Sequence, residues 1–178
     1  MQVKPGTIRA DAADMEPFGV SRPRGGAQIP QPHAPGDEAG GVVRPLNDAE
    51  SVWAAQHREL VAELCDHGFD TPTVGGLFDR VHGTWLDAPD PGDPEPLVHA
   101  FGIGLGDLVR QRVPGLDWAS YTDRAGTELV LSHAEHDLVI FPIASVGAHW
   151  GNVGPGWFAE HVDVVVDGAL GRIPPHAP

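Results

Sequence analysis

The chain has 178 residues, of which 41% are hydrophobic, so it is long enough for one globular domain with additional segments. Its formal net charge is −14, and the basic and acidic residues up to Asn47 balance, so the excess of acid lies in the rest of the chain. An acidic folded part repels phosphate backbones and anionic lipid headgroups. This argues against nucleic acid and membrane surfaces as partners and favours a basic protein.

The cysteine content and the N-terminal sequence indicate a compartment. Cys65 is the only cysteine, so no internal disulfide can form, and its place on the apolar side of a predicted helix is that of a small buried thiol. The first residues lack the apolar run of a signal peptide, and no segment reaches the roughly 18 to 20 apolar residues of a membrane span. We therefore expect a cytoplasmic protein. The single lysine among many arginines, alanines, glycines and prolines indicates a high-GC bacterial genome.

The first 47 residues contain seven prolines and seven glycines, a share typical of disordered segments. We expect a disordered tail over residues 1–46, a single α+β domain over residues 47–171 and a short C-terminal tail over residues 172–178. A passive N-terminal tail is the preferred interpretation, although its apolar cluster at residues 15–20 or its basic cluster at residues 21–26 would suit a short docking motif.

Three helices are predicted in the first part of the domain. The first begins after Asn47, which can cap the first turn while Glu50 reaches back to complete a capping box. Gly68 ends this helix, because glycine adopts the left-handed conformation that closes helices. Thr71 and Pro72 open the second helix as cap and first-turn proline.

The third helix follows a proline-rich loop and begins at residues 93–95. It contains Gly102, Gly104 and Gly106, each of which lowers intrinsic helix stability by about 1 kcal/mol relative to alanine. We expect these glycines to allow the close approach of a neighbouring element. A phosphate-binding loop is the weaker interpretation, because no strand precedes the glycines and no Lys-Ser or Lys-Thr pair follows them.

The apolar pattern changes from helical to strand-like after Gly115. Strands are predicted at residues 116–122, 127–132 and 138–141, joined by turns at residues 123–126 and 133–136. A short helix at residues 143–150, a loop at residues 151–156 and a final helix at residues 157–170 follow. The predicted fold class is therefore α+β, with helices packed on a small three-stranded antiparallel β-meander.

The sequence resembles a bacterial family in four places. These are residues 101–109 (FGIGLGDLV), the strand that contains Trp118, the turn at residues 123–126, and the pair Phe141 and Pro142. Together they resemble the family called domain of unknown function 3806, over roughly residues 46–170. The resemblance implies a small α+β domain and no catalytic residues.

Histidines at and after the end of the meander are the best candidates for a metal site. His133, His136 and His149 are the proposed ligands, because imidazoles bind zinc and related divalent metals. No His-Glu-x-x-His or cysteine-pair motif accompanies them. A serine hydrolase is not indicated, because the serines of the predicted strands and of the following helix lie outside any Gly-x-Ser-x-Gly motif.

A binding surface is predicted beside the glycine-rich loop at residues 151–156. Trp150 and Trp157 flank this loop, Asn152 lies within it, and His149 precedes it. Aromatic side chains beside a flexible loop often contact a partner, although capping of the core would explain them equally well.

The leading hypothesis from the sequence is a non-catalytic cytoplasmic module that binds a protein. A basic protein is the expected partner, and no cofactor is expected. Two alternatives stay open. One is a small metal-dependent enzyme or metal-binding protein that uses the clustered histidines, and the other is an acidic inhibitor or immunity-type protein.

Overall fold

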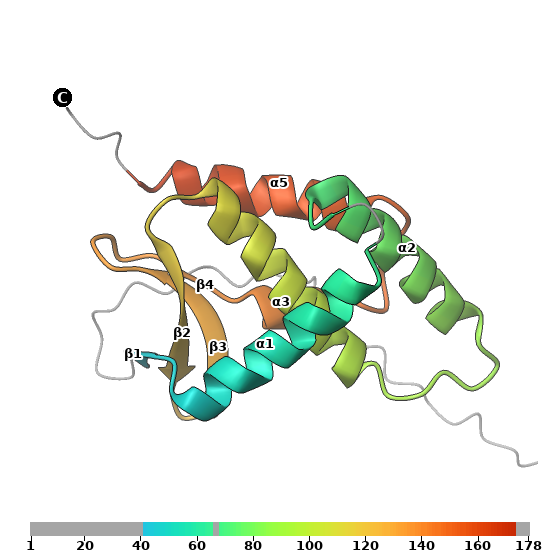
Figure 1. The fold of residues 1–178 in the computed structure, drawn as a ribbon, viewed down its shortest axis with the longest axis horizontal. Coiled ribbons are helices and arrows are strands. Elements are labelled where there is room, and N and C mark those ends of the chain that lie inside the picture. Colours follow the sequence, from blue (N-terminus) through green and yellow to red (C-terminus); the bar gives the residue numbers. More distant parts are fainter. Residues whose placement is uncertain (1–40, 66–67, 174–178) are drawn as a thin grey trace, which may run out of the picture.

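A computed structural model describes residues 41–65 and 68–173 of the chain (Figure 1). Within these residues, five helices and a four-stranded antiparallel sheet form an α+β fold, which confirms the predicted class. In chain order the elements are β1 (Val42–Pro45), α1 (Asp48–Glu63), α2 (Thr71–Asp87), α3 (Glu95–Arg112), β2 (Leu116–Thr122), β3 (Thr127–His133), β4 (Val139–Ile140), α4 (Pro142–His149) and α5 (Trp157–Leu170). Residues 1–40 of the predicted N-terminal tail and 174–178 of the predicted C-terminal tail lie outside the described residues.

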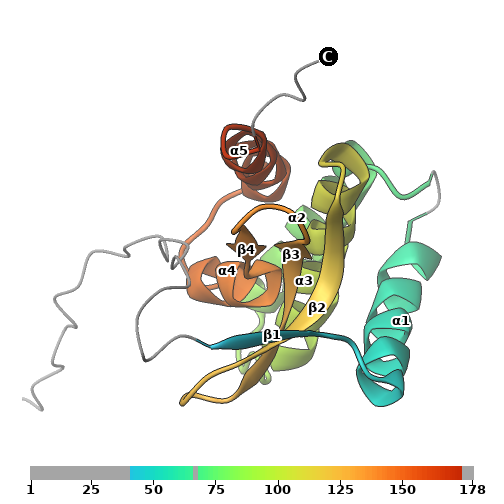
Figure 2. The same ribbon diagram turned by 90° about the vertical axis from the view of Figure 1, so that its left-hand side faces the viewer.

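The sheet has the order β1-β2-β3-β4, and all neighbouring strands are antiparallel. Its last three strands are the predicted meander, in which Tyr121 lies opposite Glu128 and Leu131 opposite Ile140. The predicted number of three strands is wrong, because β1 pairs with β2 and forms an edge of the sheet (Figure 2).

The additional strand comes from residues that the sequence analysis places in the tail. Its four residues are all exposed, so no alternating apolar pattern marks them, and pairing with β2 is what makes them a strand. Pro45 ends the strand, and an edge position tolerates a residue without an N–H donor. At the other end, the Gly41 N–H donates to the Tyr121 hydroxyl at 3.2 Å. The folded part therefore begins before the predicted boundary at residue 47.

Of the two predicted helix caps, one is confirmed and one lies a residue away from its predicted position. The Glu50 N–H donates to the Asn47 side chain and the Asn47 N–H donates to the Glu50 carboxylate, both at 2.9 Å, so the capping box is confirmed. In α2 the cap is Asp70, one residue before the predicted Thr71, and its carboxylate accepts the Thr73 N–H at 2.8 Å.

Helix α3 runs through the middle of the fold, with α1 and α5 on opposite sides of it (Figure 1). All ten residues from Ala100 to Val109 are buried. A Cβ atom added to Gly102 would lie 2.6 Å from the Ile143 Cα in α4, and one added to Gly106 would overlap the Trp118 indole. The predicted close approach is therefore confirmed at these two glycines, whereas at Gly104 an added Cβ would make only ordinary contacts, of 3.6 Å or longer.

A buried carboxylate connects α1, α3 and β2. Asp107, 5% exposed, accepts hydrogen bonds from the Arg58 guanidinium through Nε and Nη2, and from the Trp118 indole Nε1 at 2.8 Å. The hydrogen bond with Asp107 raises the pKa of Arg58 above its ordinary value, so the guanidinium stays charged although it is partly buried. This network joins three elements at one point.

Aromatic side chains fill the core between α2, α3 and α5. The Phe78 ring lies 5.1 Å from each of the rings of Phe101 and Phe158, and 5.6 Å from the Trp150 ring. His82 is also buried here, and its Nε2 lies 2.5 Å from the Trp150 carbonyl oxygen. No helix in the described part of the chain combines the length and hydrophobicity needed to cross a membrane.

Candidate functional site

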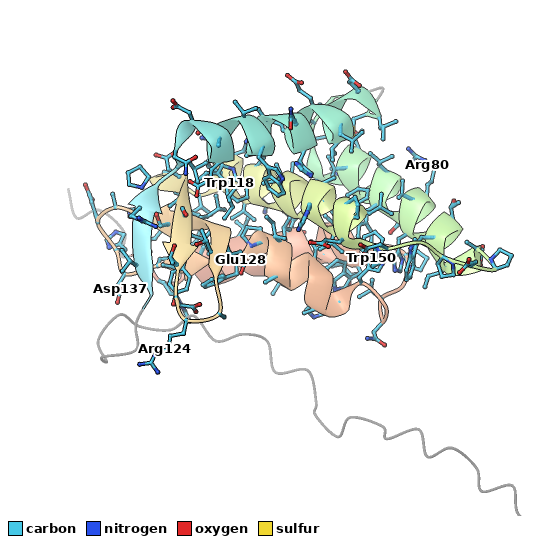
Figure 3. The ribbon with its side chains drawn as sticks, turned by 90° about the horizontal axis from the view of Figure 1, so that it is seen from below. Arg80, Trp118, Arg124, Glu128, Asp137 and Trp150 are labelled. Carbon is cyan, nitrogen blue, oxygen red and sulfur yellow. The ribbon has the colours of Figure 1, made fainter. Side chains whose placement is uncertain are left out.

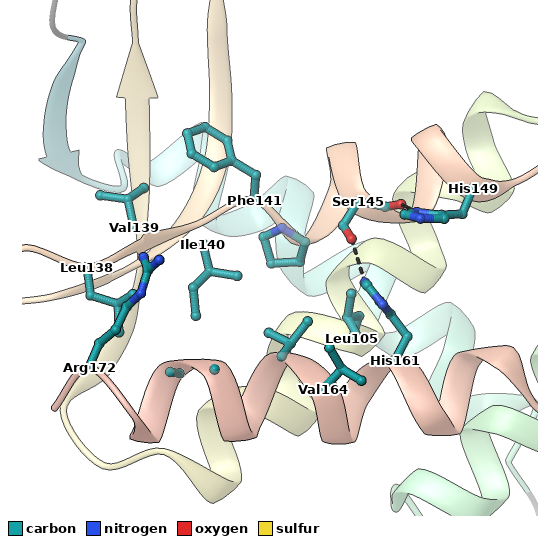
Figure 4. A pocket seen from close by; sticks show the side chains of 14 residues that line it. Leu105, Leu138, Val139, Ile140, Phe141, Ser145, His149, His161, Val164 and Arg172 are labelled. Atoms are coloured by element: carbon teal, nitrogen blue, oxygen red, sulfur yellow. Dashed lines mark hydrogen bonds between the residues drawn. The ribbon is translucent and has the colours of Figure 1, made fainter. Parts of the chain in front are cut away.

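A pocket of about 250 Å³ lies between β4, α4 and α5 (Figure 4). Most of its lining is apolar, and the polar side chains within that lining come from α4, α5 and the residues just after α5. The lining residues are Leu105, Leu138, Val139, Ile140, Phe141, Pro142, Ser145, His149, His161, Val164, Val165, Gly168, Ala169 and Arg172. Two further hollows, one beside β1 and β2 and one between α2 and the start of α3, contain no histidine. We therefore treat the first pocket as the candidate site.

Ser145 and His161 form a hydrogen-bonded pair across the pocket. The Ser145 Oγ of α4 lies 2.6 Å from the His161 Nε2 of α5 (Figure 4). Burial lowers the pKa of His161 to about 4, and the neighbouring His149 ring adds to this effect. His161 is therefore neutral at pH 7, and the pair presents a hydroxyl and an imidazole without charge.

His149 extends this polar end of the pocket. Its Nδ1 lies 2.8 Å from the Ser145 carbonyl oxygen, which can only accept, so Nδ1 carries the proton of that hydrogen bond. The His149 ring centroid is 5.1 Å from that of Trp157 and 5.4 Å from that of His161. The Trp157 and His161 rings are stacked at 4.7 Å. The imidazoles are thus held in place by one backbone oxygen, one hydroxyl and one indole.

Arg172 lies at the opposite end of the pocket. Its side chain extends from the end of α5 toward Leu138 and Val139, away from Ser145 and His161 (Figure 4). The residue is exposed, and within residues 41–65 and 68–173 no carboxylate lies at ion-pair distance from its guanidinium. The pocket therefore has a cationic end, an apolar middle and a neutral polar end.

Two carboxylates accept hydrogen bonds from the backbone at the starts of the helices that carry these side chains. The Ala144 N–H in the first turn of α4 donates to the Glu128 carboxylate of β3 at 3.1 Å, and burial raises the pKa of that carboxyl. The N–H of Gly156, which has a φ of 86°, donates to both oxygens of Asp79 at 2.9 and 3.0 Å. Since Gly156 is the N-cap of α5, Asp79 sets where that helix starts.

The four residues predicted to form a binding surface are in different environments. His149 and Trp157 lie against each other beside the pocket. Asn152 is exposed in the loop, and its N–H donates to the His149 carbonyl at 2.9 Å. Trp150 is 3% exposed and belongs to the aromatic core, and its Nε1 has no hydrogen-bond partner within the described residues. Figure 3 shows it enclosed among the helices.

The predicted metal ligands do not assemble into one site. The rings of His133 and His136 are 4.4 Å apart at the connection from β3 to β4, while His149 is the last residue of α4. Among the residues that the structure describes, no three His, Cys, Asp or Glu side chains are placed to hold a metal ion together. His133 and His136 are close in sequence and lie at the same turn, whereas the His149 ring packs beside those of Trp157 and His161.

Ser145, His161 and Arg172 line the pocket, a role that was not predicted for them from the sequence. A signal for two of them is present in the spacing, because Ser145 and His149 are four residues apart, as are Trp157 and His161. Residues at that spacing share a helix face, so each helix presents two polar or aromatic side chains on one side. No local pattern indicates that the two faces meet.

The lowered pKa of His161 predicts a pH dependence of stability. Unfolded, this histidine titrates near 6.5, and in the folded protein near 4, so between these values the unfolded state binds more protons and stability falls as the pH falls. His149 and Arg172, the other titratable groups lining the pocket, are unchanged in a His161→Gln variant. The quantity to measure, by urea unfolding, is the free energy of unfolding of the wild type minus that of this variant. We expect this difference to drop by about 2 kcal/mol from pH 7 to pH 4.5, a value that allows for the partial exposure of His161. A constant difference would contradict the prediction.

A crystal structure of a protein from Bacteroides thetaiotaomicron VPI-5482 is similar in fold, with a TM-score of 0.58 and 15% sequence identity. The similarity covers 76% of this chain but 51% of the other, so this chain spans about half of that protein's length. At this identity the likeness concerns the fold alone. No curated protein matches the chain.

Residues 82–160 match the model of the family described as "Domain of unknown function (DUF3806)". The matched range runs from the second half of α2 into α5, so it includes α3, the meander and α4 with Ser145 and His149. It is shorter than the expected resemblance over residues 46–170, and both His161, the next residue, and Arg172 fall outside it. The resemblance inferred from the sequence is nevertheless confirmed. Over residues 82–160, the chain is therefore similar to the DUF3806 family.

Proposed function

We propose that this domain is a non-catalytic binding module, and that its site is the pocket between β4, α4 and α5. The observation that carries the proposal is an apolar pocket into which a hydroxyl and two imidazoles converge. A largely apolar lining with a few placed polar groups is the usual composition of a small-molecule site. The volume of about 250 Å³ suits a small ligand with an apolar body.

The pKa and the location of the Ser145–His161 pair argue against catalysis. A serine hydroxyl next to an imidazole resembles the nucleophile and base of a hydrolase. A general base works best with a pKa near the working pH, whereas the pKa of His161 is about 4. The Ser145 hydroxyl also lies within a helix rather than on an exposed turn. The pair is therefore better suited to hydrogen bonding than to proton transfer.

The expected protein partner stays a prediction. The acidic composition supports attraction of a basic protein, and the same argument supports the alternative of an acidic inhibitor or immunity-type protein. A cytoplasmic location likewise stays a prediction from the sequence. Pocket binding is compatible with both, because a small ligand and a protein partner can occupy different faces of one domain.

Filling the pocket tests the proposal. Gly168 lines the pocket, and an added Cβ there would meet nothing within 4 Å, so Gly168→Leu places a side chain in the pocket without overlap at Cβ. We expect one molecule of the neutral apolar fluorophore N-phenyl-1-naphthylamine to bind per wild-type chain, and to bind about tenfold more weakly to the variant.

Gly83→Leu is the matched control, because Gly83 in α2 is equally open and lies outside the pocket. Its affinity for the fluorophore should equal that of the wild type. Absence of saturable binding to the wild type, or an equal loss of affinity in both variants, would contradict the proposed site.

A further inference from the structure

The two ends of the pocket differ in charge. Arg172 provides a guanidinium at one end, and Ser145 and His161 provide a neutral hydrogen-bonded pair at the other (Figure 4). Resting on the proposed function, we infer that the ligand is an aliphatic carboxylate whose carboxylate group pairs with Arg172 and whose chain lies along the apolar middle of the pocket.

The guanidinium of Arg172 is available to a ligand. Arg58, Arg110 and Arg112 each pair with a carboxylate of the protein, whereas Arg172, like Arg44, Arg80 and Arg124, has no such partner within the described residues. Arg172 is the arginine that lines the candidate pocket. Arginine stays charged at all ordinary pH values, and its planar fork matches the two oxygens of a carboxylate. On a chain of net charge −14, an uncompensated cation beside an apolar pocket is a specific place for an anion.

A carboxylate fits this end better than a phosphate ester. A phosphate group carries about 1.5 to 2 negative charges at pH 7 and offers three acceptor oxygens. One arginine compensates only part of that charge, and the acidic composition opposes the rest. The pocket lining contains one arginine and no lysine, so its positive charge corresponds to a monoanion.

The remainder of the pocket suits an alkyl chain. Its middle is formed by side chains such as Leu105, Ile140 and Val165. At the far end, the Ser145 hydroxyl and the His161 imidazole satisfy each other at 2.6 Å, so a chain that passes them leaves neither group unpaired. Each methylene buried against this lining contributes about fourfold in affinity until the pocket is full.

Displacement of N-phenyl-1-naphthylamine from the full-length protein tests the inference. The competitors are octanoate, 1-octanol and octylamine, which share a chain and differ in charge. We expect octanoate to displace the fluorophore at a concentration about threefold to fivefold lower than 1-octanol, which is the upper part of the range for an exposed ion pair, and octylamine to be the weakest. The advantage of octanoate should shrink as the salt concentration rises.

Arg172→Gln should remove the advantage of octanoate over 1-octanol. Arg124→Gln is the matched control, because it removes the same charge from the exposed β2–β3 turn, where the side chain points away from the body (Figure 3). Equal displacement by octanoate and 1-octanol, or an advantage that survives Arg172→Gln, would overturn the inference while the pocket remained a binding site. Failure of the fluorophore itself to bind the wild type would instead refute the proposed function, and the inference with it.

Discussion

Replacement of Asp107 by alanine is expected to lower the free energy of unfolding by about 3 kcal/mol, near the lower end of the range for breaking a buried ion pair. The change leaves the Arg58 guanidinium and the Trp118 indole N–H without their acceptor in a place where water has little access. Arg58 is partly exposed, so its charge can recover some hydration, and this keeps the expected loss from being larger. Urea unfolding followed by circular dichroism measures the change.

A matched control comes from the exposed pair of Arg112 and Asp163, whose Nη1 and Oδ1 atoms lie 2.5 Å apart. Asp163→Ala should change the free energy of unfolding by less than about 1 kcal/mol, because both groups of an exposed pair are solvated when separated. Asp107→Asn should lie between the two, since an amide oxygen can still accept the indole N–H. Equal effects of Asp107→Ala and Asp163→Ala would contradict the structural role of the buried network.

Replacement of Gly102 by alanine is expected to lower the free energy of unfolding by about 2 kcal/mol. The added Cβ would lie 2.6 Å from the Ile143 Cα, and this neighbour is backbone, so α3 and α4 would have to move apart. The intrinsic preference of helices for alanine offsets about 1 kcal/mol of this cost and is already included in the net value.

The same substitution two residues further along α3 should have the opposite sign. An alanine at Gly104 would make contacts no closer than 3.6 Å, so only the helix preference acts, and we expect the free energy of unfolding to rise by up to about 1 kcal/mol. Thermal and urea unfolding of the two variants compares the same chemical change in one helix. If both variants were stabilised, the close packing of α3 against α4 would be refuted.

Local signals in the sequence are sufficient to predict most of the helices and strands of the fold. The capping box of Asn47 and Glu50 depends on residues three apart, and the β2–β3 hairpin on the turn at residues 123–126, so both are predictable. The close approach at Gly102 and Gly106 is predictable from the residue type. The ordinary contacts at Gly104 are not, because they depend on which side of α3 each neighbouring element occupies.

The candidate site is less predictable because it depends on contacts between distant residues. Ser145 of α4 and His161 of α5 are brought together in three dimensions, and the N-cap of α5, Gly156, is held by Asp79 of α2, 77 residues earlier in the chain. Trp150 illustrates the reverse case, since a tryptophan next to a glycine-rich loop looks like a surface residue, yet the packing of α2 and α3 buries it.

Strand β1 has a practical consequence for work on the isolated domain. A fragment that begins at Asn47 would lack the partner of β2, and the row of N–H and C=O groups from Ala119 to Thr122 would be left open to solvent. An unprotected strand edge can pair with the same edge of another molecule and so promotes aggregation. The Tyr121 hydroxyl would also lose its contact with Gly41. Fragments intended for crystallisation or solution NMR should therefore begin no later than Gly41.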